Sequence, residues 1–434
     1  ARLSRPQAGL FAGLLVAFYG PLIFYEAQFL RTGLLTFLYT ALLYVMVRGQ
    51  EKPDGRWGFA AGGLWAVGLI AKPTLAALLP AVPVWLWLMW KQALGRDDGG
   101  HAFRRFVALG VLGFALFLAP LVARNAAAGA PLFSVSRRGA LEFAASNLPG
   151  SDGEGWILTQ EALDLTLASG RRMSVTAVRA LAAWRDRPLG FVSLQLRKAG
   201  QYFSGFEIPN NVNYYVEREY VWLFRLPLVG WPVTLALGLL GMGRLRRKWR
   251  TAFVLYAYVG LYSLGVVAFY VLARFRLPVV PALCVFGGVG IDWMIGLARA
   301  KEWKWLGAAA AFVAVVVIVV WPRPDDPFRP GDYINLARYH VLRREPAQAF
   351  AWIERGRKSL EARAADYDPA ALHCQRAWYR FVAGEPLEAV ADELRPALAS
   401  PSSVTAMLAG QLAQELDRRR TEDPKVLGMR FISP

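Results

Sequence analysis

The sequence predicts an all-α membrane protein that crosses the bilayer many times and ends in a soluble helical domain. Hydrophobic residues make up 55% of the 434 residues and only 19% are charged, a composition that excludes a disordered chain. Long uncharged runs alternate with short basic connections. The runs lack the apolar–polar alternation of barrel strands, so helices are the expected spanning form.

A helical span needs about 20 mostly apolar residues, and this criterion gives about nine spans. They lie near residues 8–25, 32–48, 58–72, 74–90, 105–122, 221–242, 251–273, 277–297 and 305–321. The third and fourth runs are short and meet around Lys72, where the sequence does not define their boundary.

The formal net charge of +18 is compatible with either a nucleic-acid partner or a membrane topology. The connections at 1–7, 48–57, 91–105, 243–250 and 298–304 carry 17 basic and five acidic residues, and all fall on one side of a nine-span count. The positive-inside rule makes that side cytoplasmic. We therefore expect no nucleic-acid partner, because the basic residues are not gathered in a soluble domain.

The long connection 123–219 falls on the opposite, extracytoplasmic side. It is nearly neutral, with 11 basic and nine acidic residues, and it is too long for a simple loop. Ser174–Trp184 and Phe191–Phe203 have apolar residues at helical spacing. This pattern predicts amphipathic helices that lie on the membrane or on the spans.

The composition turns polar after the membrane domain, 1–321. Residues 322–330 read as a Pro-rich linker, and 331–434 are predicted to form an extracytoplasmic helical domain. Two sets of residues have the spacing of a tetratricopeptide repeat: Tyr333, Leu336, Ala337, His340, Ala349, Ile353 and Gly356, then a weaker copy at Ala377, Gly384, Ala389 and Pro401. Small residues at these positions allow close packing of antiparallel helices. A generic helical hairpin domain explains them equally well.

Five basic side chains lie in short outer connections or at outer span ends, against the single acid Glu26. They are Arg31, Lys72, Arg225, Arg274 and Arg276. The positive-inside rule does not require positive charge on this side, and ionisable groups near the membrane are commonly functional. Because Arg and Lys bind phosphate, the set predicts a site for the phosphate of a lipid-linked sugar. Each residue taken singly is also explained by snorkelling to the interface.

Five short motifs carry a resemblance to a known family. Residues 120–134 read P-L-V-A-R-N-A-A-A-G-A-P-L-F-S, Gly139–Gly150 contains Asn147, and 69–74 read L-I-A-K-P-T. Residues 274–281 read R-F-R-L-P-V-V-P, and 207–211 read E-I-P-N-N. Together they resemble segments of bacterial dolichyl-phosphate-mannose–protein mannosyltransferase-like enzymes, which are related to aminoarabinose transferases. The resemblance covers most of 8–300.

The resemblance implies a GT-C fold and a glycosyltransferase of the bacterial inner (cytoplasmic) membrane. Such an enzyme moves a sugar from a polyprenyl-phosphate-linked donor to a glycan, lipid or protein acceptor, with inversion, on the extracytoplasmic face. The matching positions imply phosphate- or substrate-binding roles for Lys72, Arg124, Asn125, Arg274 and Arg276, with Glu207, Asn210 and Asn211 as further candidates. For Arg124 and Asn125, a structural role in capping the span end fits equally well.

Enzymes of this family carry a catalytic acidic residue in the first outer loop. In this sequence Glu26 is the only acid in a short outer connection, so it is the candidate general base; an ordinary interfacial carboxylate is the alternative. The chain begins like a cytoplasmic flank, and we expect an upstream segment to hold the catalytic acid, unless the protein is non-catalytic. A divalent metal is compatible with this chemistry, although no Cys/His ligand cluster is visible in the sequence.

Other functions fit parts of the pattern. An O-antigen ligase or polymerase also has many spans, a large outer loop and outer arginines, although the motifs argue against it. A non-catalytic membrane scaffold that binds protein partners through its tetratricopeptide-like tail is the non-enzymatic alternative. A transporter is disfavoured, because charged residues avoid the span centres and no inverted repeat is visible.

Overall fold

A computed structural model describes residues 5–421, apart from residues 29, 96–97, 137, 152, 154–158, 323–325, 365–368 and 401–402. Within these residues the chain is helical and has no strand, only an isolated bridge between Tyr19 and Val229. The predicted all-α class is therefore confirmed. The chain forms two compact units, which comprise 1–157, 165–210 and 223–323, and 158–164, 211–222 and 324–434.

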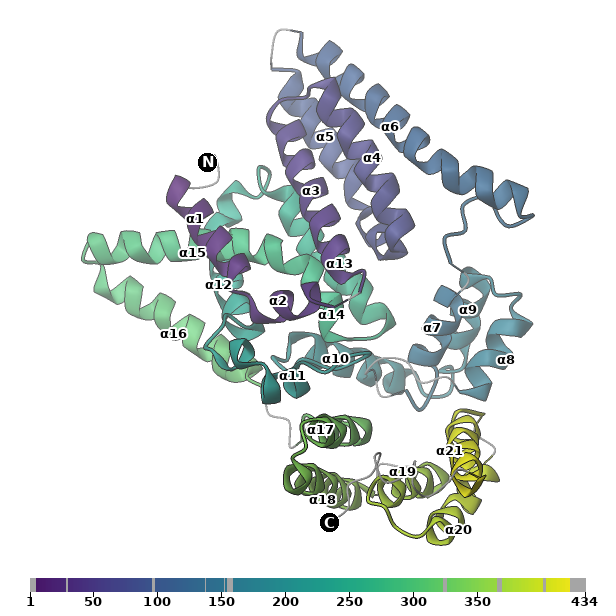
Figure 1. Ribbon diagram of the computed structural model, residues 1–434. Coiled ribbons are helices and arrows are strands. Elements are labelled where there is room, and N and C mark those ends of the chain that lie inside the picture. Colours follow the sequence, from purple (N-terminus) through teal and green to yellow (C-terminus); the bar gives the residue numbers. More distant parts are fainter. Residues whose placement is uncertain are drawn as a thin grey trace. The chain divides into compact units, whose positions relative to one another are not determined.

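The first unit contains the four span-length apolar helical stretches, and Figure 1 labels its helices. Its N-terminal half consists of α1 Pro6–Ala17, α2 Gly20–Glu26, α3 Thr32–Glu51, α4 Gly55–Ala71, η1 Pro73–Leu78, α5 Ala81–Ala93 and α6 Gly99–Ala127. The segment after α6 forms α7 Arg138–Asn147, α8 Gln160–Ala168 (shared between the units), α9 Met173–Ala182 and α10 Pro188–Phe203. The remainder forms η2 Trp222–Arg225, α12 Trp231–Leu245, η3 Arg246–Lys248, α13 Phe253–Phe269, α14 Ala273–Arg276, η4 Leu277–Val279, α15 Val280–Arg299 and α16 Trp303–Val320.

Four helical stretches of the described chain are long and apolar enough to cross a membrane. They are Thr32–Glu51, Gly99–Ala127, Ala273–Arg299 and Trp303–Val320. The protein is thus a polytopic helical membrane protein. The other predicted spans form shorter helices, so the count of nine stays a prediction. The two amphipathic helices expected in the long connection are present as α9 and α10.

The first predicted span, 8–25, is not one continuous helix. It is divided into α1 and α2 at Phe18 and Tyr19, where the backbone pairs with Val229 instead of continuing the helix: Val229 N donates to Phe18 O, and Gly20 N to Val229 O, both at 2.9 Å. Pro21 is the second residue of α2, in the first helical turn, where the missing N–H of proline is not needed. The apolar run predicted membrane burial but not this break.

The boundary around Lys72 is a sharp change of direction. Lys72 is extended, with φ −158° and ψ 121°, as expected of a residue that precedes a proline. Pro73 opens η1, and α5 starts only at Ala81. The Lys72 side chain is consequently placed at the end of α4, outside the regular helix.

Helices α4 and α6 pack against each other (Figure 1), and glycines lie at their closest approach. A Cβ on Gly62 would overlap the carbonyl oxygen of Gly110, and one on Gly113 would overlap that of Phe59. Small residues that allow two backbones to approach are a common means of helix association in membranes, where apolar burial gives little driving force.

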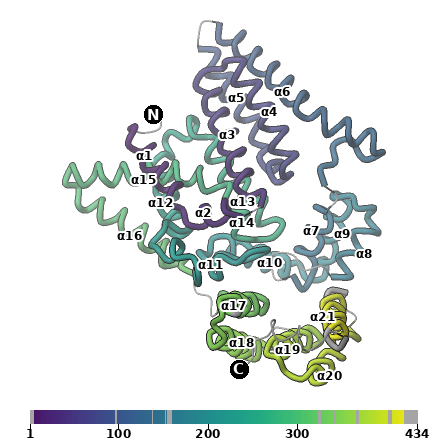
Figure 2. The backbone as a smooth tube through the Cα atoms, in the orientation of Figure 1, coloured from purple at the N-terminus to yellow at the C-terminus, as the bar shows by residue number. Residues whose placement is uncertain are grey.

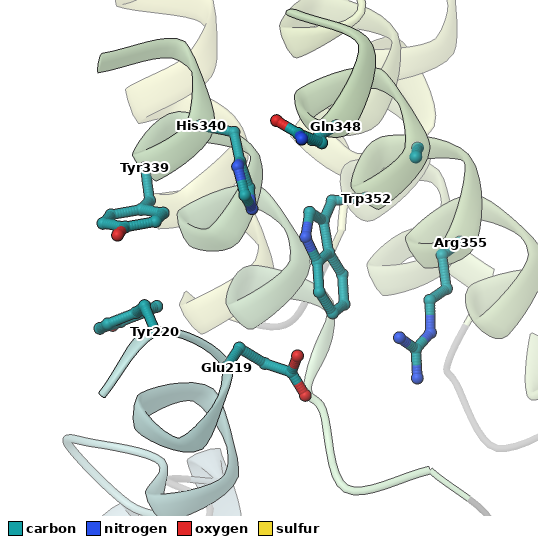
Figure 3. Close-up of a pocket in the computed structure, with 8 residues that line it drawn as sticks. Glu219, Tyr220, Tyr339, His340, Gln348, Trp352 and Arg355 are labelled. Atoms are coloured by element: carbon teal, nitrogen blue, oxygen red, sulfur yellow. The ribbon is translucent and has the colours of Figure 1, made fainter. Parts of the chain in front are cut away.

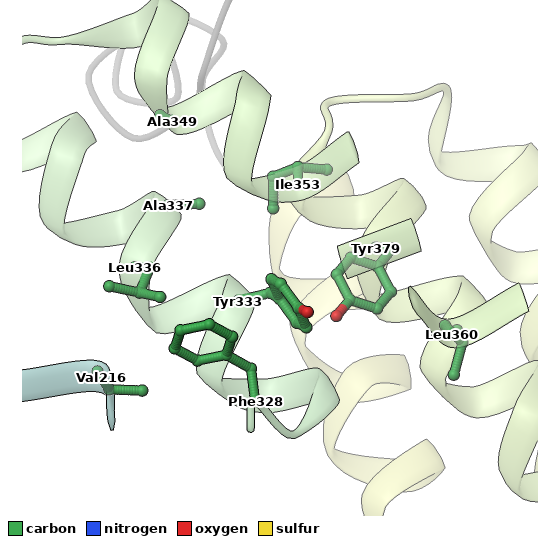
Figure 4. Close-up of a cluster of buried hydrophobic side chains, with 9 residues drawn as sticks. All are labelled: Val216, Phe328, Tyr333, Leu336, Ala337, Ala349, Ile353, Leu360 and Tyr379. Carbon is green, nitrogen blue, oxygen red and sulfur yellow. The ribbon is translucent and has the colours of Figure 1, made fainter. Parts of the chain in front are cut away.

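The second unit contains the helical tail. Its helices are α11 Tyr214–Tyr220, α17 Pro330–Leu342, α18 Pro346–Ala362, α19 Pro369–Val382, α20 Leu387–Leu398 and α21 Ser403–Thr421. The tail follows the chain as successive helical hairpins (Figure 2). Val216 of α11 is buried in the same cluster as Tyr333, Leu336 and Ile353 (Figure 4). The unit therefore includes residues 211–222 in addition to the predicted 331–434.

The positions expected from a tetratricopeptide spacing lie where two helices meet. Tyr333, Leu336 and Ala337 of α17 and Ala349 and Ile353 of α18 are all buried. A Cβ on Gly356 would come within 2.8 Å of Tyr333 Cβ. The helix pair is confirmed, and its identity as a tetratricopeptide repeat stays a prediction. In the weaker copy, Ala377 is buried and Gly384 has a φ of 77°, while Pro401 lies outside the described residues.

Candidate active site

Three of the predicted outer basic residues converge in the first unit. Arg31 precedes α3, Lys72 follows α4, and Arg274 belongs to α14. Arg31 Nη1 donates to the carbonyl oxygen of Ala71, next to Lys72, at 3.3 Å. Lys72 Nζ lies 3.1 Å from the ring centre of Phe275, and the Arg274 guanidinium lies 5.2 Å from the same centre. We call Arg31, Lys72 and Arg274 the basic triad.

The charges of the basic triad act on one another. Lys72 is subject to the positive fields of Arg274 and Arg31, and Arg274 to that of Arg31. Like charges held this close repel, and the repulsion is strong where protein has displaced water. Lys72 and Arg274 are half-buried, and the Phe275 ring offsets only part of the cost. An anion bound among the three would relieve the repulsion.

Glu142 of α7 supplies a negative charge to this site. Its carboxylate interacts electrostatically with Lys72, Arg274 and the hydroxyl of Tyr270. Composition alone does not distinguish Glu142, because it is one of 20 acidic and basic residues in the long connection. The available signal was its place in the Gly139–Gly150 motif, five residues before Asn147.

Asn147 explains why α7 stays beside the basic triad. Its Nδ2 donates to Ala268 O of α13 at 3.1 Å, and its Oδ1 accepts from Gln195 Nε2 at 3.0 Å and from Lys198 Nζ at 2.9 Å. Its carbonyl oxygen accepts from the Trp184 indole at 2.6 Å. One buried amide thus joins α7 to α10 and to the C-terminal end of α13, the helix that leads into Tyr270 and Arg274.

Lys198 is fully buried in this network. Its Nζ donates to Asn147 Oδ1 and, at 2.7 Å, to Phe269 O. Burial lowers the pKa of Lys198 to about 7, because a charged ammonium is costly away from water. A neutral amine has two N–H donors, and Lys198 Nζ donates two hydrogen bonds.

Glu26 lies at the edge of this region. It is exposed at the end of α2. Its Cγ lies 3.3 Å from the position that a Cβ would take if Gly33, in the first turn of α3, carried a side chain. The adjacent Tyr25 is buried and interacts electrostatically with Arg274. The predicted base therefore lies beside the first turn of α3, which follows Arg31, and its catalytic role stays a prediction.

Arg124 and Asn125 have structural partners at the end of α6. Asn125 is fully buried, and its Nδ2 donates to the carbonyl oxygens of Pro131, Leu132 and Ser134 at 3.2, 2.8 and 3.0 Å. Arg124 donates to Asn125 Oδ1 through Nε at 3.1 Å and Nη2 at 2.6 Å. The geometry supports the structural interpretation, in which the pair holds the turn after α6.

Arg276 also has partners inside the protein. It is 1% exposed and forms an ion pair with Glu207 at 3.1 Å. It also donates to the carbonyl oxygens of Tyr202, Ser204 and Phe206. Arg276 thus connects α14 to the segment after α10, and we do not include it or Glu207 in the proposed phosphate site.

The remaining candidates, Asn210 and Asn211, follow Glu207 closely in the chain. Asn210 is half-buried and Asn211 is exposed, at the boundary between the two compact units; their roles stay predictions. Across the described ranges, no three His, Cys, Asp or Glu side chains lie close enough to hold a metal ion. A divalent metal therefore stays a prediction without an identified ligand set.

The fold and the basic triad define a helical membrane protein with a cluster of basic side chains at the ends of its apolar helices. Residues 1–122 match the family model of dolichyl-phosphate-mannose-protein mannosyltransferase. The match includes Arg31 and Lys72 and supports a membrane glycosyltransferase of the GT-C type. No curated protein and no solved structure matches the chain significantly.

Proposed function

We propose that the protein transfers a sugar from a polyprenyl-phosphate-linked donor to an acceptor hydroxyl on the extracytoplasmic face of a bacterial inner membrane. The observation that carries this proposal is the convergence of Arg31, Lys72 and Arg274 beside Glu142. Two guanidinium groups and one lysine beside one carboxylate make a net positive site at the ends of apolar helices. A lipid phosphate would bring the compensating negative charge there.

In the proposed reaction, the acceptor oxygen bonds to the anomeric carbon of the sugar as the bond from that carbon to the phosphate oxygen breaks. One direct displacement inverts the anomeric configuration. The departing polyprenyl phosphate gains negative charge, which the basic triad stabilises; such preorganised charge is usually the largest catalytic term. The acceptor proton passes to a carboxylate, for which Glu142 is our first candidate and Glu26 our second.

Binding of a short lipid phosphate tests the site directly. We suggest titrating the full chain in lipid nanodiscs with farnesyl phosphate, farnesol and inorganic phosphate. We expect Arg31→Ala, Lys72→Ala and Arg274→Ala each to weaken farnesyl phosphate binding about tenfold, as for the loss of a charge-assisted hydrogen bond. Farnesol should bind weakly and with no response to the substitutions.

Arg187 provides a matched control, since it is an exposed arginine at the start of α10 in the same unit. Arg187→Ala should bind farnesyl phosphate like the unchanged chain. Equal binding by all three triad variants would overturn the phosphate site. Tight binding of inorganic phosphate alone would indicate a free anion as the ligand instead of a lipid.

A further inference from the structure

A pocket of about 320 Å³ opens in the second unit, far along the chain from the basic triad (Figure 3). It lies between α11 and the α17–α18 pair, and six of its lining residues are Glu219, Tyr220, Tyr339, Gln348, Trp352 and Arg355. The volume is at the lower end of the range for small-molecule sites, about 300–1,000 Å³. The pocket therefore fits a ligand of one or two small rings.

The wall formed by α11 is held in place before any ligand arrives. Asn213, just before α11, donates through Nδ2 to Asp332 Oδ2 at 2.8 Å and to Pro327 O at 2.9 Å. Tyr220 at the other end of α11 stacks on Tyr339 of α17, with ring centres 4.6 Å apart and planes 23° apart. A site formed in advance loses less conformational entropy on binding.

Trp352 is the central apolar surface of the pocket. Its ring packs against Phe328 at 5.6 Å and Tyr333 at 6.2 Å between ring centres, so its orientation is fixed by the core. Figure 3 shows the indole between His340 and Arg355, with the Glu219 carboxylate directed toward the same space. His340 Nδ1 is engaged with Glu345 Oε2 at 2.7 Å, which orients its ring.

The polar groups around Trp352 offer hydrogen bonds of both kinds. Glu219 can accept, the exposed amide of Gln348 can do both, and Arg355, whose guanidinium lies 4.9 Å from the Trp352 ring centre, can donate. Glu219 and Arg355 carry opposite charges, so the pocket favours neither an anion nor a cation. A suitable ligand is neutral, with one apolar face and hydroxyl groups around its edge.

We propose that this pocket binds a pyranose ring of a neutral glycan. The C–H groups on one face of a pyranose can pack against an aromatic ring, while its hydroxyl groups both donate and accept around the edge; apolar surface with a few placed polar groups is the usual design of small-ligand sites. The further idea that this glycan is the acceptor of the sugar transfer rests on the proposed function. Glycan binding by the pocket does not depend on that function.

Saturation-transfer NMR on the full chain in nanodiscs tests the proposal. The probes are mannotriose, maltotriose and chitotriose, with trialanine as a peptide comparison. We expect at least one trisaccharide to receive saturation at the ring protons of one face. Gln348→Ala and Glu219→Gln, both at exposed positions, should raise the dissociation constant about tenfold, the size expected of a central contact in a small site. Trp352→Ala should abolish the signal.

The matched controls are Gln411→Ala on α21 and Glu388→Gln on α20, which are exposed residues of the same types outside the pocket. They should bind the trisaccharide unchanged. The glycan site would be overturned if none of the three sugars received saturation, or if saturation survived Gln348→Ala and Glu219→Gln. Saturation of trialanine alone would overturn it as well. Sugar binding without farnesyl phosphate binding would instead contradict the proposed function and leave this site standing.

Discussion

Arg276 pairs with Glu207 at 3.1 Å, and the two side chains are 1% and 6% exposed. Two residues earlier, Arg274 belongs to the basic triad and rests on Phe275. A single four-residue helix, α14, thus presents one arginine to the protein interior and one to the proposed phosphate site. The two arginines of the R-F-R motif therefore have different surroundings, although both were predicted to bind phosphate.

This division predicts different consequences for neighbouring substitutions. Arg276→Ala leaves a buried carboxylate at Glu207 without its counter-ion, which typically costs about 3–5 kcal/mol, so we expect a large fall in the unfolding temperature. Arg274→Ala should leave the unfolding temperature nearly unchanged and reduce farnesyl phosphate binding. Differential scanning fluorimetry in nanodiscs measures the first effect. If both variants melt like the parent chain, the structural role of Arg276 is wrong.

Glu142→Gln separates catalysis from phosphate binding. The substitution keeps the shape of the side chain and removes the negative charge beside Lys72 and Arg274. We expect farnesyl phosphate to bind equally or more tightly, while sugar transfer to the acceptor falls about 10²–10⁴-fold, the usual contribution of a general base. The measurement is transfer of a radiolabelled sugar from its polyprenyl phosphate. Glu161→Gln, on α8, is the control and should retain full transfer.

The pH dependence of stability reports on Lys198. Its pKa of about 7 in the folded chain is below the value of about 10.4 for an unfolded lysine. Between these values the unfolded chain binds more protons, so the free energy of unfolding should rise with pH from about 7 to about 10. Below pH 7 this contribution is constant.

Comparing unfolding temperatures of the chain and Lys198→Met at several pH values tests the effect, with Lys358→Met at an exposed position as the control. The Lys198→Met variant should lose the rise in this range, whereas Lys358→Met should keep it. Parallel pH curves for all three proteins would show that Lys198 remains charged in the folded state.

Two glycine substitutions should act in opposite directions. Gly62→Ala places a methyl group against the carbonyl oxygen of Gly110 and must force α4 away from α6, so we expect a lower unfolding temperature. Gly260→Ala on α13 meets nothing within 4 Å and should be neutral or stabilising by up to about 1 kcal/mol, because alanine favours helix. A stabilised Gly62→Ala variant would be incompatible with the observed α4–α6 packing.

The sequence indicated which kinds of residue the candidate site contains more fully than it indicated how they are arranged. Long apolar runs and basic connections were sufficient for the helical membrane class. The surplus of outer basic residues predicted a phosphate site, and the fold brings three of those residues together: Arg31, Lys72 and Arg274. The spacing of small residues also located the α17–α18 pair correctly. The break at Tyr19 was not visible, because it depends on pairing with Val229 far along the chain.

Local sequence determined the helices and their apolar faces, since hydrophobic periodicity and proline act over a few residues. Only the tertiary structure decided which charges act together. Arg274 and Arg276 differ by two positions, yet the turn of α14 directs one toward Lys72 and Glu142 and the other toward Glu207. Electrostatic interaction and desolvation depend on distance and burial, and both are properties of the folded chain.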